Sequence, residues 1–143
     1  MQVIDSEKVD KLLNYILTNF DNEENLLLKN STLLVFAAAT DSSHKAKVWE
    51  LVRIFFDKIF KTFEHENARI RKSATYLMLK ATKNFGKNFN TAQVELILTK
   101  CIGMINHSNK NSVKICSIFS NIIKARGDPN TIKNDSKISI IFY

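Results

Sequence analysis

Residues 48–59 read VWELVRIFFDKI, and the spacing of their apolar side chains decides the fold class. Successive apolar residues of this set lie 3, 1, 3, 1 and 3 positions apart, as on one face of an α-helix: Val48, Leu51, Val52, Phe55, Phe56 and Ile59. The same spacing of apolar residues occurs 39 positions earlier, at Val9, Leu12, Leu13, Ile16, Leu17 and Phe20. It occurs again 46 positions later, at Val94, Ile97, Leu98, Cys101, Ile102 and Ile105. A recurrence of about 40 residues is typical of helical repeat arrays, which work through their surfaces.

Turn residues divide the chain into six predicted helices, which form three hairpins. The helices are expected at 6–20, 25–39, 44–63, 68–85, 90–105 and 112–125. Asp21 and Glu24 are expected to form a capping box for the second helix, and Asn67 to cap the fourth. Gly86 is expected to follow the end of the fourth helix, and Gly127-Asp128-Pro129 to end the sixth.

The second helices of the three hairpins also align, at an offset of 43 residues. Leu27, Ile70 and Val113 share one aligned position, and Leu33, Tyr76 and Phe119 share another. The third copy departs most from the pattern, since Leu34 and Leu77 correspond there to Ser120. The alignment predicts that these positions are structurally equivalent in the three hairpins.

The turn and second helix of the middle hairpin resemble the HEAT repeat, of the HEAT/armadillo type. Residues 66–74 read ENARIRKSA. In the HEAT pattern a polar turn precedes a Val-Arg-x-x-Ala-like string, and Ile70, Arg71 and Ala74 fill those slots. The resemblance covers about residues 6–127 and points to no single subfamily. It implies an all-α, right-handed solenoid of about three antiparallel hairpins that wraps a partner.

The end of the chain does not fit the repeat. We expect a solenoid domain at 1–129 and an irregular tail or truncated end at 130–143. Residues 138–143 read ISIIFY, which is strand-like, and no partner strand is evident. Either the tail packs on the last helix as a cap, or the chain is a truncated form of a longer array.

Composition narrows the location of the protein. The sequence has no run of 18 apolar residues, so no membrane span is expected, and residues 1–25 lack the pattern of a signal peptide. Its two cysteines, Cys101 and Cys116, both fall in apolar helical patterns. Two buried free thiols, rather than a disulfide or a redox pair, suit a reducing compartment. We therefore expect a cytoplasmic or nuclear protein.

Charge is distributed unevenly along the chain. Residues 1–42 hold three basic and seven acidic residues, whereas residues 43–87 hold eleven basic and four acidic residues. Residues 88–143 hold seven basic and three acidic residues, and the net charge is +7. The asymmetry predicts that an acidic partner docks on the middle and end of the array, with a solvated face as the alternative.

One stripe of the fourth predicted helix carries the candidate binding residues. They are spaced 3, 4, 4, 3 and 4 positions apart: Arg69, Lys72, Tyr76, Lys80, Lys83 and Lys87. A row of cations with one tyrosine suits a phosphate backbone or an acidic peptide. The alternative is that the stripe simply faces water, since the neighbouring hairpins do not continue it.

No constellation in the sequence supports catalysis. His44, His65 and His107 have no Cys, Asp or Glu at metal-ligand spacing and are expected to be solvated. Trp49 is expected to pack in the core or between repeats. There is no glycine-rich phosphate loop and no Ser-His-Asp or Cys-His arrangement. We expect no enzymatic activity, no metal and no cofactor.

These patterns favour a non-catalytic scaffold or adaptor that binds another protein, with an acidic surface, along its curved face. The alternative is a nucleic-acid-binding array that uses the 69–87 stripe for phosphates. Steep weakening with salt would favour that alternative. A trafficking module of the VHS or ENTH type is a third interpretation, and the acidic first 25 residues oppose membrane binding. Apolar end hairpins also predict self-association through open solenoid ends.

Overall fold

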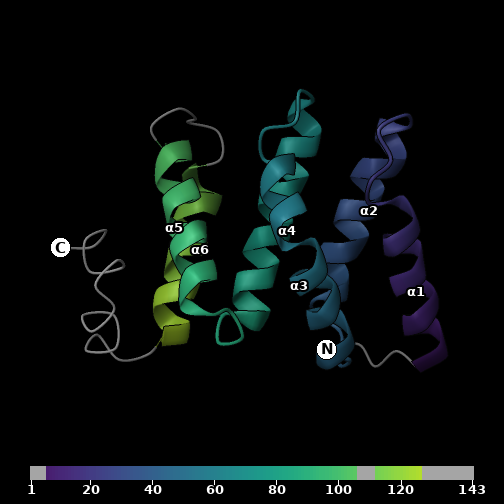
Figure 1. Cartoon of the computed structure of the whole chain (residues 1–143), viewed down its shortest axis with the longest axis horizontal. Helices are drawn as coiled ribbons and strands as arrows, with labels where there is room; N and C mark the ends of the chain where they lie inside the picture. The colour runs from purple at the N-terminus through teal and green to yellow at the C-terminus, as the bar shows by residue number, and fades with distance from the viewer. Residues whose placement is uncertain (1–5, 106–111, 127–143) are drawn as a thin grey trace. The chain divides into compact units, whose positions relative to one another are not determined.

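The computed structural model describes residues 6–105 and 112–126, and this part of the chain is all-helical, without a strand. Figure 1 shows its six helices: α1 (Ser6–Asn19), α2 (Leu26–Ala39), α3 (Lys45–Thr62), α4 (Ala68–Phe85), α5 (Thr91–Ile105) and α6 (Ser112–Arg126). Each end lies within one residue of its expected position, which confirms the helix predictions. The 130–143 tail, the domain boundary at 129 and His107 lie outside the described residues.

Asparagine side chains begin three of the helices. The Asn67 Oδ1 accepts hydrogen bonds from the backbone N–H groups of Arg69 and Ile70, at 2.9 and 3.2 Å, which confirms the predicted cap of α4. Asn90 and Gln93 form a reciprocal pair at the start of α5, with both hydrogen bonds at 2.8 Å. These bonds satisfy backbone donors that the first turn of a helix leaves unpaired.

The predicted capping box of α2 is wrong. Asn25 is the N-cap, and its Oδ1 accepts from the Leu28 N–H at 3.0 Å. The preceding turn is closed by the Asn22 Oδ1, which accepts from the Glu24 and Asn25 N–H groups. Asp21 does not cap the helix, because its side chain forms an ion pair with Lys58 of α3 at 2.8 Å.

The chain forms two compact units, which are described separately below. The first is Met1–Asn84 and the second is Phe85–Tyr143. In the first unit α1 packs against α2 and also touches α3, and in the second unit α5 packs against α6. The pairs α1–α2 and α5–α6 therefore pack as expected for hairpins.

Three phenylalanines form the centre of the first unit. Phe20 follows α1 and stacks on Phe55 of α3, with ring centroids 4.3 Å apart. Phe36 of α2 meets both rings edge-on, at 6.2 Å in each case. Each such pair contributes about 0.5–1.5 kcal/mol beyond the burial of its area. The trio therefore joins the first hairpin to α3.

The three repeated apolar faces are buried to different extents. All six members of the α3 set are buried. In the α1 set Leu17 is 47% exposed, and in the α5 set Ile102 and Ile105 are each 38% exposed. The recurrence therefore marks helix faces correctly, and the middle copy is the one that is fully enclosed.

The second helices α2 and α4 lie side by side in the first unit. The Ser73 hydroxyl donates to the Asn30 Oδ1, and the Asn84 Nδ2 donates to the Asp41 Oδ1 at 2.9 Å. Both contacts join residues 43 positions apart, and they lie 11 residues apart along each segment, with Asp41 just beyond the end of α2. Two contacts at a constant offset show that α2 and α4 run in the same direction with matched levels.

The expected equivalence of positions 43 apart is nevertheless wrong. Leu27 is 70% exposed whereas Ile70 is 1% exposed. The buried faces match at an offset of 41 instead, which pairs Lys29 with Ile70 and Phe36 with Leu77. A shift of two residues turns a helix face by about 200°. The leucines at 27 and 34 are therefore on the outside of α2.

Candidate functional site

The predicted basic stripe lies on the outward side of α4, apart from its last residue. Arg69, Lys72 and Lys83 are exposed, and Tyr76 and Lys80 are half-buried. The opposite side of the helix is buried, with members at the complementary spacing: Ile70, Ala74, Leu77 and Ala81. We call the five residues Arg69, Lys72, Tyr76, Lys80 and Lys83 the α4 basic face. Lys87 follows the end of α4 and belongs to the second unit, so it is not part of this face.

Lys80 is already engaged within the first unit. Its ammonium lies 2.7 Å from the Asp41 Oδ2, and its side chain is only 18% exposed. The hydrogen bond to Asp41 raises the pKa of Lys80. Burial would raise the pKa of Asp41, but hydrogen bonds from Lys80 and Asn84 outweigh burial and lower it. The charges available to a partner on this face are therefore those of Arg69, Lys72 and Lys83.

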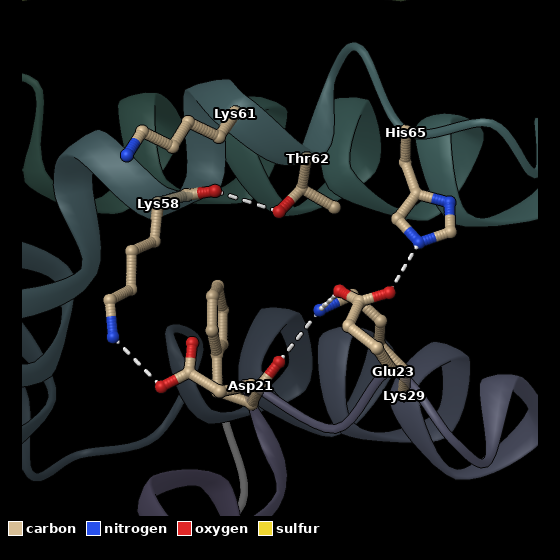
Figure 2. Close-up of a pocket in the computed structure, with 8 residues that line it drawn as sticks. Asp21, Glu23, Lys29, Lys58, Lys61, Thr62 and His65 are labelled. Atoms are coloured by element: carbon tan, nitrogen blue, oxygen red, sulfur yellow. Dashed lines mark hydrogen bonds and ion pairs between the residues drawn. The ribbon is translucent and has the colours of Figure 1, made fainter.

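A second feature, which sequence reasoning missed, is a polar pocket in the first unit. It has a volume of about 280 Å³ and lies between the turn that follows α1 and the end of α3. Figure 2 shows Lys58 and His65 pointing across the pocket toward Asp21 and Glu23, with which they form ion pairs. It is lined by Phe20, Asp21, Glu23, Lys29, Lys58, Lys61, Thr62 and His65.

Lys29 is the buried charge of this pocket, with a side chain that is 4% exposed. Its ammonium donates to the Phe20 carbonyl at 2.8 Å and lies 3.0 Å from the Glu23 Oε1. It also lies over the Phe20 ring, 5.4 Å from the centroid. A buried ammonium is tolerated only when such partners replace water. Lys29 therefore fixes the α1–α2 turn against the start of α2.

His65 joins this turn to the one between α3 and α4. Its Nε2 lies 2.8 Å from the Glu23 Oε2, and its Nδ1 accepts from the Asn67 N–H at 3.0 Å. Because the Nδ1 is an acceptor, the neutral ring carries its proton on the Nε2 and donates to Glu23. The prediction of a solvated turn histidine is therefore wrong, because the side chain is only 15% exposed.

The pocket charges mostly satisfy one another. Hydrogen bonds from His65 and then from Lys29 lower the pKa of Glu23. Lys58 pairs with Asp21 at 2.8 Å and also lies over the Phe55 ring. Lys61 forms no ion pair with any residue in 6–105 or 112–126. The ion pairs between the two turns therefore hold the two hairpins of the first unit together.

Neither metal binding nor thiol chemistry is supported by the described residues. Among them, no group of three or more His, Cys, Asp or Glu side chains could hold a metal ion. Both cysteines are free. Cys101 is buried, and burial raises the pKa of its thiol to about 12, so it stays protonated and inert. Cys116 is exposed, contrary to expectation. The buried side chains Ile115 and Ile118 define the inner face of α6, and Cys116 lies on the other side of the helix.

Comparisons with known proteins leave the family open. No family model, no curated protein and no solved structure matches the chain. In the part of the chain that the structure covers, no helix has both the length and the apolar character to cross a membrane. The HEAT resemblance therefore rests on the sequence alone, on the threefold recurrence and on Ile70, Arg71 and Ala74. Ile70 and Ala74 are buried, and the Arg71 Nη1 donates to the His65 and Glu66 carbonyls at 2.7 and 2.9 Å.

Proposed function

We propose that this chain is a non-catalytic scaffold of HEAT-like hairpins, stacked as a right-handed solenoid, that binds another protein in the cytoplasm or nucleus. The observation that carries the proposal is the α4 basic face. Its cations Arg69, Lys72 and Lys83 are exposed, and none forms a salt bridge with the described residues. A partner with an acidic surface would supply counter-charges, which are missing for Arg69 and Lys72 and which Lys83 receives only from Asp41, beyond ion-pair distance.

The anchoring of α4 supports this role. Near its beginning, Ser73 is hydrogen-bonded to Asn30 of α2, and at its end Asn84 is hydrogen-bonded to Asp41, which follows α2. Lys45 of α3 adds a contact, because its ammonium donates to the Asn84 Oδ1 at 3.3 Å. A face held at both ends keeps its cations in a fixed row, so binding orders fewer groups.

A charge reversal with a matched control tests the proposal. We would compare the native chain with Lys72→Glu/Lys83→Glu in affinity capture from cell extract, with and without nuclease. Lys61→Glu/Lys124→Glu is the control, since it makes the same change of charge at exposed lysines outside the face. The proposal predicts a stoichiometric protein that survives nuclease, is lost in the face variant and is kept in the control. Equal capture by all three chains contradicts it.

The same cations also suit phosphates, which keeps nucleic-acid binding as the second candidate. Its prediction differs, because each phosphate contact releases counterions and makes affinity fall steeply with salt. Fluorescence anisotropy with a labelled oligonucleotide at several salt concentrations measures this slope. If capture is lost after nuclease and the slope corresponds to two or three contacts, phosphate binding replaces the protein-binding proposal.

A further inference from the structure

The outward side of α2 carries a row of apolar residues that no described segment covers. Leu27 is 70% exposed, Leu34 is 43% exposed, and Ala38 is also exposed. Their spacing of 7 and 4 places all three on one line of the helix, with the half-buried Ser31 between Leu27 and Leu34. Single exposed leucines are ordinary on protein surfaces, so this row matters only through what lies beside it.

The α4 basic face lies beside this row at matched levels. Asn30 is hydrogen-bonded to Ser73, and Leu27 and Lys72 each lie within one helical turn of that hydrogen bond. At the other end Asn84 is hydrogen-bonded to Asp41, and Ala38 and Lys83 each lie within one helical turn of that hydrogen bond. Leu34 and Tyr76 fall between the two contacts, near the same level.

Both rows also point to the same side of the helix pair. The buried faces of α2 and α4 include Phe36 and Leu77, and both point into the core of the first unit. The apolar row and the basic row occupy the opposite, solvent-facing side of their helices. The surface therefore has an apolar half on α2 and a cationic half on α4, with the Asp41–Lys80 ion pair between them at one end.

We propose that this surface binds an acidic amphipathic helix of the partner protein, a proposal that rests on the proposed function. Apolar residues of that helix pack on Leu27, Leu34 and Ala38, while its carboxylates meet Arg69, Lys72 and Lys83. The apolar row extends over 12 residues, from Leu27 to Ala38, or about 16 Å, so it accommodates about three turns of helix. Recognition of a helix through residues one and two turns apart is an established binding mode.

The two halves together select this occupant over its competitors. A nucleic-acid backbone would satisfy the cations and leave Leu27 and Leu34 in water. An uncharged apolar helix would cover the leucines and bring Arg69 and Lys72 near apolar groups without counter-charges, which is costly. Only a ligand with carboxylates flanking an apolar stripe complements both rows.

A designed peptide tests the proposal directly. The probe is a labelled 18-residue helical peptide with leucines in one stripe and glutamates along one flank. A permuted peptide of the same composition lacks the stripe, and a glutamate-only peptide lacks the leucines. Binding is followed by fluorescence anisotropy to the full chain. The expected result is saturable binding of the striped peptide and at least about tenfold weaker binding of the other two.

Variants then locate the site. Leu27→Ser/Leu34→Ser and Lys72→Glu/Lys83→Glu should each weaken binding by about tenfold or more. The controls Ile54→Ser, at a residue of α3 that is 57% exposed, and Lys61→Glu/Lys124→Glu should bind as the native chain does. Circular dichroism verifies folding, and Leu27→Ser alone replaces the double variant if that variant unfolds.

The results separate this inference from the proposed function. Unchanged binding by the leucine variant, or equal binding of the striped and glutamate-only peptides, overturns the inference. If the captured partner is still lost in Lys72→Glu/Lys83→Glu, the scaffold proposal stands without it. Tighter binding of a single-stranded oligonucleotide than of the striped peptide overturns both.

Discussion

Lys29 shows how one buried charge depends on three neighbours. Its ammonium contacts the Phe20 carbonyl, the Glu23 carboxylate and the Phe20 ring. Lys29→Ala would leave the carbonyl without its donor and open a gap beside α1. We expect a loss of about 2 kcal/mol or more in the free energy of unfolding, measured by urea denaturation.

Lys29→Met is the matched control for this substitution. Methionine keeps the unbranched stem, and the equivalent position in the second hairpin holds the apolar Ile70. Replacement of a buried ion pair by a well-packed apolar group is often close to neutral. We therefore expect a smaller loss than for Lys29→Ala. A larger loss for Met would show that the charge, and not the packing of the stem, stabilises the turn.

Glu23 makes part of the stability depend on pH. Hydrogen bonds from His65 and from Lys29 lower its pKa below the usual 4.5. The unfolded chain therefore takes up the proton first as pH falls. The stabilisation by Glu23 is present above about pH 4.5 and is lost as pH falls through the lower pKa of the folded state. In Glu23→Gln we expect a deficit in unfolding free energy that is full at pH 7 and shrinks toward pH 3.

Urea denaturation at pH 7, 5, 4 and 3 measures that deficit. Glu66→Gln, at an exposed turn position, is the control for removal of one negative charge. A deficit of the same size at every pH would contradict the prediction. It would mean that the amide replaces the carboxylate poorly for reasons of shape, and that the ionic contacts to Lys29 and His65 contribute little.

At the scale of the helix and its turn, Arg71 has a structural role in the HEAT-like string. The Arg71 Nη1 donates to two carbonyls of the turn between α3 and α4, at 2.7 and 2.9 Å. Arg71→Ala leaves both acceptors to water. We expect it to cost about 1–3 kcal/mol in the free energy of unfolding. Arg69→Ala, at the exposed start of α4, should stay within about 0.5 kcal/mol of the native chain.

Thermal and urea denaturation of the two variants measure that difference. A loss in Arg69→Ala as large as that in Arg71→Ala would contradict the prediction. It would mean that both arginines act through the general charge of the α4 start. The distinction also matters for binding, since Arg69 belongs to the α4 basic face and Arg71 does not.

The positions of the helices were predictable because they depend on local information. The 3, 1, 3, 1, 3 spacing and the asparagines at 67 and 90 act within one or two turns of helix. The cap of α2 was missed because Asp21 has an ionic partner 37 residues away, in Lys58. An acidic residue in a turn does not reveal whether it caps a helix or pairs elsewhere.

The outward leucines and the buried lysine were unpredictable for a related reason. Leu27 and Ile70 are both apolar, so an alignment of residue types cannot tell which one faces the core. Lys29 is buried because its ammonium contacts the Phe20 carbonyl and Glu23, and His65 contacts the same Glu23 carboxylate across 42 residues of sequence. The α4 basic face was predictable because its cations alternate with apolar residues inside a single helix.

On the scale of the whole chain, the charge asymmetry has a partly internal explanation. Four acidic residues of 1–42 pair with basic residues of the second hairpin inside the first unit: Asp10 with Lys47, Asp21 with Lys58, Glu23 with His65, and Asp41 with Lys80. Exposed pairs of this kind contribute at most about 1 kcal/mol each. The positions of these ion pairs favour the packing of the first hairpin on the second over other arrangements. Arg69, Lys72 and Lys83 form none of these ion pairs, so their charges are available to the proposed partner.

The division into two compact units leads to a prediction about how the chain unfolds. The Phe20–Phe36–Phe55 trio lies wholly in the first unit. Phe55→Leu should therefore weaken that unit by about 1–2 kcal/mol. In hydrogen exchange we expect faster exchange of the amides of α1, α2 and α3, with little change in α5 and α6, because each compact unit can open locally.

Leu98→Ala in α5, a buried residue of the second unit, is the reciprocal substitution. It should accelerate exchange in α5 and α6 and leave the amides around Phe55 protected. If either substitution accelerates exchange equally in all helices, the chain unfolds as one cooperative block. In that case a partner bound on α2 and α4 would protect the whole chain. With local unfolding, binding of the striped peptide should slow exchange in the first unit alone, which gives the docking proposal a second and independent readout.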